Sequence, residues 1–305
     1  MPMEHKKQAH DAWTRRVNQS AAGNTLCLIL DFSESIQLPY FRVRPSGLYF
    51  LSMPVVHICG VYDCSKLRYH QHDINVRLDT QGSFKNSDGV VSSLYFRLAK
   101  EGRADKPVDI LLDNTCSQNK NRYTMAGFQW LCMLGKASEI RVWFLDVGHT
   151  KSALDSLFGA IKLVLRRYRR VMSLEELCAA LAVTTCTPNV PEFIFDWRSK
   201  CEDLKVKGIP HIKKMFYFVI NKDGVRCRSE LEDGDLSPPQ NMFPGVKSIP
   251  LQTVKHAKPI APQPNRSKGL RVAFKHMNSL ERAFWYRIGY AAVVQAAETH
   301  NQTSP

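Results

Sequence analysis

One stretch of sequence decides the expected fold: PVDILLDNTCSQNKNRYTMAGFQWLCMLG, residues 107–135. It begins with a short apolar run, 107–113, which is typical of a strand buried on both faces. The apolar spacing over 122–135 indicates a buried helix. The strand ends on the bare carboxylate of Asp113, and an amide-rich, basic segment connects it to the helix. This strand–turn–helix unit predicts a sheet with helices packed against it.

Similar patterns continue in both directions. The other expected elements are strands at 25–31, 47–64, 66–78 and 139–148, and helices at 90–102, 150–170 and 173–182. Strands 47–64 and 66–78 are expected to pair as a hairpin, and Gly102 is a natural helix stop. Two later strands are expected at FIFDW (193–197) and MFYFVINKDGVRC (215–227), the second with a turn at Asp223–Gly224. The order predicts an α/β fold, a ribonuclease-H-like mixed five-stranded sheet flanked by helices.

Composition divides the chain into four expected regions. An N-terminal polar helix occupies 1–24, and the ribonuclease-H-like core occupies 25–235. A proline-rich basic linker or arm follows at 236–277, because seven prolines lie between positions 237 and 265. A C-terminal helix and tail complete the chain at 278–305.

Bulk charge favours a polyanionic partner. The formal net charge is +14 and the pI is about 9.4, which suits nucleic acid, although a merely soluble basic protein would look the same. No apolar run approaches the roughly 18 residues that a membrane span needs, and residues 1–24 carry no apolar segment typical of a secretory signal. Nine cysteines without a CxxC pair indicate reduced thiols of the cytosol or nucleus. We therefore expect DNA as partner, a nuclear location, no membrane and no secretion; a homo-oligomer stays open.

Three aspartates occupy comparable places in this pattern. Asp31 ends the first strand, Asp113 ends the strand of 107–113, and Asp155 lies early in the helix of 150–170. Strand ends in open α/β sheets line the ligand crevice. Carboxylates that converge there can hold Mg²⁺ (or Mn²⁺), and a pair of such ions supports phosphodiester chemistry. We expect these three residues to be metal ligands and catalytic residues.

The helix that carries Asp155 adds cations to the same region. Asp155, Gly159, Lys162 and Arg166 recur along one stripe, one residue over from an apolar face. Expected phosphate contacts are Asn114, Gln118, Asn119, Lys120, Arg122, Lys162, Arg166, Arg167, Arg169 and Arg170. The alternatives stay open: the stripe can be an ordinary exposed face, the arginines a solvated helix end, and the QNKN segment a polar helix start.

His149 lies where the strand of 139–148 meets the following helix. Its imidazole is expected to bind the scissile phosphate or to act as an acid or base. A structural role at the start of the helix is the equal alternative.

The motifs DNTCSQNKN and Gly148-His149-Thr150-x₄-Asp155, with an early strand that ends in Asp31, resemble a eukaryotic family catalogued as a domain of unknown function. Its members are abundant in transposon-rich genomes and look like transposase-derived proteins of the DDE, ribonuclease-H-like kind. The resemblance covers roughly residues 5–230. It implies metal-dependent DNA cleavage or strand transfer, with the three aspartates as the acidic positions and Asn114, Gln118, Asn119 and His149 as polar motif residues. Many members have a longer N-terminal region, so a domesticated, catalytically inactive remnant that binds DNA or protein is the alternative.

Three other classes are weaker. A 3′–5′ exonuclease requires the spacings Asp-x-Glu and His-x₄-Asp. Here Asp31–Glu34 and His149–Asp155 each have one intervening residue more, which turns one side chain away from the site. A Ser/His/Asp hydrolase lacks its G-x-S-x-G elbow, and no phosphate-binding G-x-x-x-x-G-K-[ST] loop is present. A zinc site remains a minor alternative, with candidate ligands His57, Cys59, Cys64, His70 and His72.

Overall fold

The computed structural model describes residues 11, 13–18, 25–64, 72–82, 84–102, 106–144, 153–230, 234–260 and 263–290. Its strands are β1 (Leu26–Phe32), β2 (Ile36–Gln37), β3 (Tyr40–Phe41), β4 (Val55–Asp63), β5 (His72–Leu78), β6 (Val108–Leu112), β7 (Ile140–Phe144), β8 (Arg170–Val171), β9 (Cys186–Asn189), β10 (Tyr217–Asn221) and β11 (Gly224–Arg228). Its α-helices are α2 (Ser87–Glu101), α3 (Arg122–Met133), α4 (Ala153–Leu165), α5 (Leu174–Ala182), α6 (Trp197–Asp203), α7 (Pro264–Ala273) and α8 (Ser279–Trp285). Short 3-10 or π turns lie at Ser46–Leu48, Asp79–Gln81, Ile212–Lys214, Leu251–Thr253, Phe274–His276 and Tyr286–Tyr290.

The main sheet is mixed and has the strand order β11-β10-β7-β6-β1-β4-β5-β9, with β2 beside β4. Strands β1, β4 and β5 pair antiparallel, and β6 and β7 continue from β1 in parallel. The inner five strands, β5-β4-β1-β6-β7, therefore comprise three antiparallel strands, followed by two that alternate with helices. The α/β class and the mixed sheet are confirmed, and the arrangement is compatible with a ribonuclease-H-like fold.

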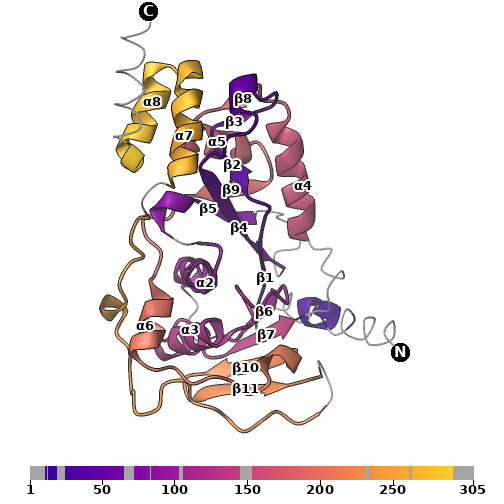
Figure 1. Cartoon of the computed structure of the whole chain (residues 1–305). Helices are drawn as coiled ribbons and strands as arrows, with labels where there is room; N and C mark the ends of the chain where they lie inside the picture. Colours follow the sequence, from indigo (N-terminus) through magenta and orange to yellow (C-terminus); the bar gives the residue numbers. More distant parts are fainter. Residues whose placement is uncertain are drawn as a thin grey trace, which may run out of the picture.

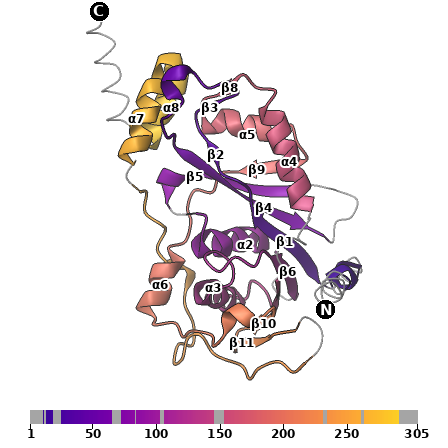
Figure 2. The same cartoon turned by 45° about the vertical axis from the view of Figure 1, so that its right-hand side comes forward.

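Helices cover both faces of this sheet, which forms the middle layer of three (Figure 1). Helices α2, α3 and α6 pack on one face, and α4 and α5 pack on the other, as the turned view also shows (Figure 2). Strand β1 faces both layers because its even residues, such as Leu28 and Leu30, join one core and its odd residues, such as Cys27 and Ile29, join the other. This two-sided burial explains its nearly continuous apolar sequence.

The local predictions mostly hold, with two corrections. The β4–β5 hairpin is confirmed, Gly102 closes α2 with a φ of 64°, and β10 and β11 form the later hairpin. The sheet has nine strands rather than five, because β9, β10 and β11 extend it at its edges and β2 pairs with β4. FIFDW was expected to be a strand, but it makes a single bridge, Phe195 to His256, before α6 begins. Its aromatic side chains pack around Trp130 instead, so tertiary packing outweighs its β-rich composition.

The segments outside the expected core are packed onto it. Within the proline-rich arm, Met242, Phe243, Ile249 and Val254 are buried in the α2–α3 layer. Helix α7 lies inside the range 236–277 that was expected to be a linker. Together with α8 it lies near β3 and β8 at the top of Figure 1. At the other terminus residues 13–18 are helical, as expected. The described part of the chain contains no helix with the length and apolar character needed to cross a membrane.

Candidate functional site

The pairing of β1 with β6 brings two of the three aspartates together. Leu30 pairs with Leu112 in parallel register, so Asp31 and Asp113 are the next residues on adjacent strands. Neighbouring strands lie about 4.8 Å apart. Because Ile29 and Leu111 both face the α4 layer, the alternation of side chains directs Asp31 and Asp113 to that same face. Two carboxylates therefore meet at the carboxyl end of the sheet.

Helix α4 brings the third aspartate to this face. Gly60 on β4 pairs with Asp31, and a Cβ atom at Gly60 would lie only 2.6 Å from Leu154 Cδ2. The first turn of α4 can therefore cross directly over the strand because Gly60 has no side chain. Asp155 follows Leu154 in that turn and is exposed. An isolated glycine in a strand, such as Gly60, is the sequence signal of such a close approach.

The electrostatics of Asp31 reflect this gathering. Burial, with a smaller contribution from the charges of Asp113 and Asp155, raises the pKa of Asp31 from 3.8 to about 6. A hydrogen bond from the Phe32 backbone N–H to Asp31 Oδ1, at 2.7 Å, and the charge of Lys85 oppose the rise. The charges of Asp113 and Asp155 thus disfavour the ionised form of Asp31, and a bound cation would favour it.

The carboxylates fit hard divalent cations in their chemistry. Asp113 already accepts hydrogen bonds at both oxygens, from the Asn114 backbone N–H at 2.8 Å and from the Thr115 hydroxyl. Within the described ranges, no three His, Cys, Asp or Glu side chains are grouped closely enough to hold a metal ion as they stand. Asp31, Asp113 and Asp155 thus supply ligands of a suitable chemical type.

Asp31→Asn is expected to change the pH dependence of stability. A carboxyl whose pKa is raised by folding destabilises the folded state as pH rises from about 4 through about 6, because its charged form is disfavoured there. The variant should therefore unfold with a free energy about 1–3 kcal/mol higher than wild type near pH 7.5, and with little difference near pH 3.5. Urea denaturation at both pH values measures this.

The control for this prediction lies in the same protein. Burial also raises the pKa of Asp88 to about 6. Asp88 is present in wild type and in Asp31→Asn, so the difference in stability between the two reports on Asp31 alone. Millimolar Mg²⁺ or Mn²⁺ should raise the melting temperature of wild type but not of Asp31→Asn. Only the wild type has a carboxylate at position 31 that can bind the ion. Equal stability near pH 7.5 would show that Asp31 is solvated rather than buried beside like charges.

The QNKN segment builds the turn from β6 to α3. The Asn119 side chain donates to the Asp113 carbonyl at 2.9 Å. Lys120 is 1% exposed, donates to the Lys213 carbonyl and lies 4.1 Å from the ring centre of Phe216. Asn121 caps α3 by accepting from two backbone N–H groups. The expectation of phosphate contacts at Asn119 and Lys120 is therefore corrected: both side chains are inside the protein.

The other predicted contact residues are more accessible. Asn114 and Gln118 are half-buried in the turn, and Arg122 is exposed on α3, where it lies over the ring of Tyr123. Lys162 forms a 2.6 Å ion pair with Glu34. Four exposed arginines follow α4, namely Arg166, Arg167, Arg169 and Arg170.

Arg170 also has a structural contact. It donates to the His276 carbonyl and pairs with Glu281 of α8 at 3.1 Å. Its guanidinium therefore holds the C-terminal helix against β8, and because Arg170 is also exposed, its role as a phosphate contact stays a prediction.

The remaining candidates divide into two groups. His149 lies outside the described residues, as does His70. Among the described members of the zinc set, His57 and His72 lie at opposite ends of the β4–β5 hairpin. Burial raises the pKa of Cys59 to about 12, which disfavours a thiolate ligand. The zinc set is therefore not gathered in the described part of the chain.

Comparison with known protein families gives a match. Residues 55–230 match the family model described as a domain of unknown function (DUF7869). No curated protein and no solved structure matches the chain. The matched range includes Asp113 and Asp155 and begins after Asp31. Because the match covers more than half of the chain, this protein belongs to the DUF7869 family.

Proposed function

We propose that this protein is a transposase- or integrase-like DNA enzyme of the DDE type, which uses Mg²⁺ or Mn²⁺ to cleave phosphodiester bonds or to transfer strands. One observation carries the proposal. Asp31 and Asp113 are adjacent in the register of β1 and β6, and the charges of Asp113 and Asp155 both act on Asp31. Carboxylates from two adjacent strand ends and a facing helix are the ligand arrangement that paired divalent ions need.

The residues of the site have separable tasks. Asp31, Asp113 and Asp155 would hold the ions, which supply activation of the attacking oxygen and stabilisation of the leaving one when bound. Asp31 must give up its proton to become a ligand, so its pKa of about 6 makes metal binding weaker below that pH. Hydrogen bonds from Asn114 and Thr115 fix the orientation of the Asp113 carboxylate.

A nicking assay tests the proposal. The full chain is incubated with supercoiled plasmid and with DNA containing single-stranded regions, in Mg²⁺, Mn²⁺, Ca²⁺ or EDTA. Nicks are expected in Mg²⁺ and Mn²⁺ only, because the larger, more flexibly coordinated Ca²⁺ supports binding better than chemistry. Cutting in EDTA would reject the metal-dependent mechanism.

A DNA-binding protein that does not cut is the second candidate. The observation that favours it is the lack, in the described ranges, of three acidic or other ligand side chains grouped for a metal ion. Such a domesticated remnant would bind DNA through its basic surface and leave it intact in every cation. Binding without nicking in Mn²⁺ across varied substrates would select this candidate.

Replacing Arg166, Arg167 and Arg169 with Ala is expected to weaken DNA affinity similarly for all sequences. Phosphate contacts release counterions, and each lost contact lowers the slope of log affinity against log salt by about 0.9. The triple variant should lower this slope by about 2 or more. Fluorescence anisotropy over a salt series measures it.

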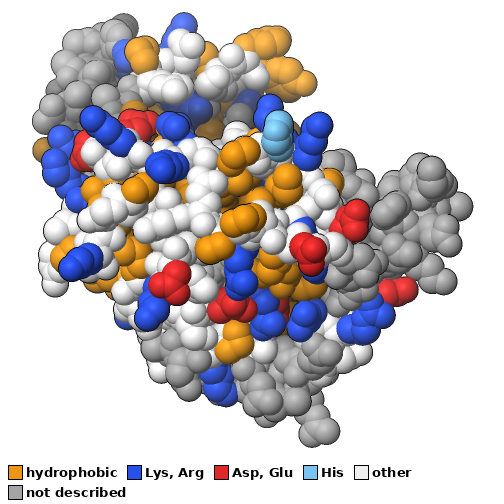
Figure 3. Space-filling model, turned by 90° about the horizontal axis from the view of Figure 1, so that it is seen from below, with side chains coloured by type: hydrophobic (Ala, Val, Ile, Leu, Met, Phe, Trp, Pro, Cys, Tyr) orange, Lys and Arg blue, Asp and Glu red, His pale blue; other side chains and the backbone are white. Residues whose placement is uncertain are grey.

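The matched control removes three other exposed cations. Lys and Arg side chains also spread over the surface seen from below, among acidic and hydrophobic ones (Figure 3). Lys247, Lys255 and Lys258 are exposed on the arm, which packs on the opposite face of the sheet from α4. Their Ala variant loses the same charge and should keep most of the slope. Equal slopes in both variants would mean that the arginines have no special contact with DNA.

A further inference from the structure

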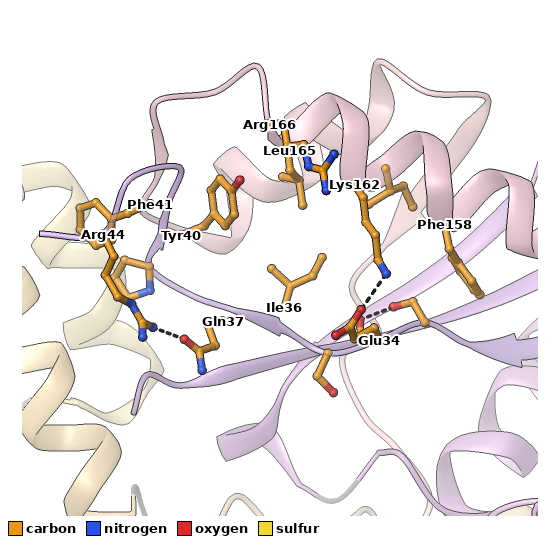
Figure 4. A pocket seen from close by; sticks show the side chains of 14 residues that line it. Glu34, Ile36, Gln37, Tyr40, Phe41, Arg44, Phe158, Lys162, Leu165 and Arg166 are labelled. Carbon is orange, nitrogen blue, oxygen red and sulfur yellow. Dashed lines mark hydrogen bonds and ion pairs between the residues drawn. The ribbon is translucent and has the colours of Figure 1, made fainter. Parts of the chain in front are cut away.

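A cavity of about 370 Å³ opens between the segment after β1 and the C-terminal half of α4 (Figure 4). Its apolar lining consists of Ile36, Pro39, Tyr40, Phe41, Phe158, Ile161 and Leu165. In Figure 4, the side chain of Ile36 extends from β2 into the space between Tyr40 and α4. The volume falls in the range of small-ligand sites, about 300–1,000 Å³. The cavity can thus hold one flat aromatic group but not a stretch of double helix.

The rim of the cavity is positive. Arg44, Lys162 and Arg166 oppose a single carboxylate, Glu34, so three positive charges face one negative charge. Glu34 pairs with Lys162, and Arg44 donates to the Gln37 side-chain oxygen. An apolar, aromatic interior with a surplus of cations at the rim suits a ligand that combines a flat ring with phosphates.

The position of the cavity connects it to the carboxylates. Its lining begins at Ser33, two residues after Asp31. Along α4, Asp155 lies in the first turn, and Phe158 and Lys162 follow on the cavity side. Arg166 lies directly after the helix and also lines the cavity. A DNA strand with one phosphate at Asp31, Asp113 and Asp155 would therefore place a neighbouring nucleotide at the mouth of the cavity.

We propose that this cavity receives one unpaired DNA base next to the phosphate on which the carboxylates act, with the flanking phosphates on Arg44 and Arg166. The inference rests on the proposed function, because it names the form of DNA that the same site takes. Stacking on an aromatic side chain stabilises a bound base by about 1–3 kcal/mol. The protein should therefore prefer single-stranded or locally unpaired DNA to continuous duplex.

The test is a binding experiment in EDTA, so that cleavage does not contribute. Ile36→Trp fills the cavity and leaves every charge in place, and Val43→Trp is the matched control because Val43 is 81% exposed and outside the lining. Ile36→Trp is expected to weaken binding of a labelled single-stranded oligonucleotide by about fivefold or more. Its affinity for the duplex should change less than about twofold, and Val43→Trp should bind both DNAs like wild type.

Tyr40→Ala removes an aromatic wall without filling the cavity, and it decides the question if Ile36→Trp fails to fold. It should also lower single-strand affinity selectively. Three results would each overturn the proposal. The first is unchanged single-strand binding in both folded variants, and the second is an equal loss of affinity for single strand and duplex. The third is tighter binding of RNA than of DNA of the same sequence. A wild type that nicks DNA while the cavity variants bind normally would reject the base site alone. Cavity-dependent binding without nicking in Mn²⁺ would reject the cleavage function alone, and no binding of any DNA would reject both.

Discussion

Asp113→Asn is expected to lower DNA nicking in Mg²⁺ or Mn²⁺ by about a hundredfold to a thousandfold, the range for loss of one electrostatic contribution to catalysis. The fold should survive. An Asn side chain can still accept from the Asn114 backbone N–H, and its amide can donate to the Thr115 hydroxyl. The change therefore removes one negative charge and keeps the shape of the turn. A gel assay of plasmid nicking measures the loss.

DNA binding should separate from cutting in this variant. With one carboxylate charge fewer, repulsion of phosphate falls, so affinity for DNA should be equal to or higher than that of wild type. Asp203→Asn makes the same change at an exposed position on α6 and should nick like wild type. If Asp113→Asn cuts as well as wild type, Asp113 is not a ligand of the metal.

Trp285→Ala is expected to lower the free energy of unfolding by about 3–5 kcal/mol, the usual cost of removing a fully buried Trp. Trp285 is 0% exposed, and its ring packs edge-on against Phe284 and Tyr290. Its Nε1 donates to the Met172 carbonyl at 2.9 Å. The variant would leave both a cavity and a buried acceptor without its donor. Urea denaturation measures the change.

This result would decide whether the C-terminal region is part of the domain. Tyr286 follows Trp285 and is 49% exposed, so Tyr286→Ala should change stability by no more than about 0.5 kcal/mol. The sequence predicted 278–305 as a separate helix and tail. A cost below about 1 kcal/mol for Trp285→Ala would agree with that separation and would contradict the packing seen here.

The sequence by itself determined the local elements and the order in which they follow one another. Strand β6 and helix α3 lie within about one or two residues of their expected ranges because burial on both faces and helical spacing leave distinct patterns. The sequence also left open that the QNKN segment is a polar helix start, and Asn121 indeed caps α3. The three aspartates could be named because each follows directly from the end of a strand or the start of a helix.

Only the tertiary structure decided what those residues contact. The placement of Lys120 beside Phe144 and Phe216 depends on strands distant in sequence, and no local pattern records it. The pairing of Leu30 with Leu112 sets the position of Asp31 beside Asp113, since strand register is a non-local choice. The cavity beside α4 forms where the segment after β1 folds back against that helix. Sequence periodicity specifies which face of an element is buried, whereas long-range pairing specifies which faces meet.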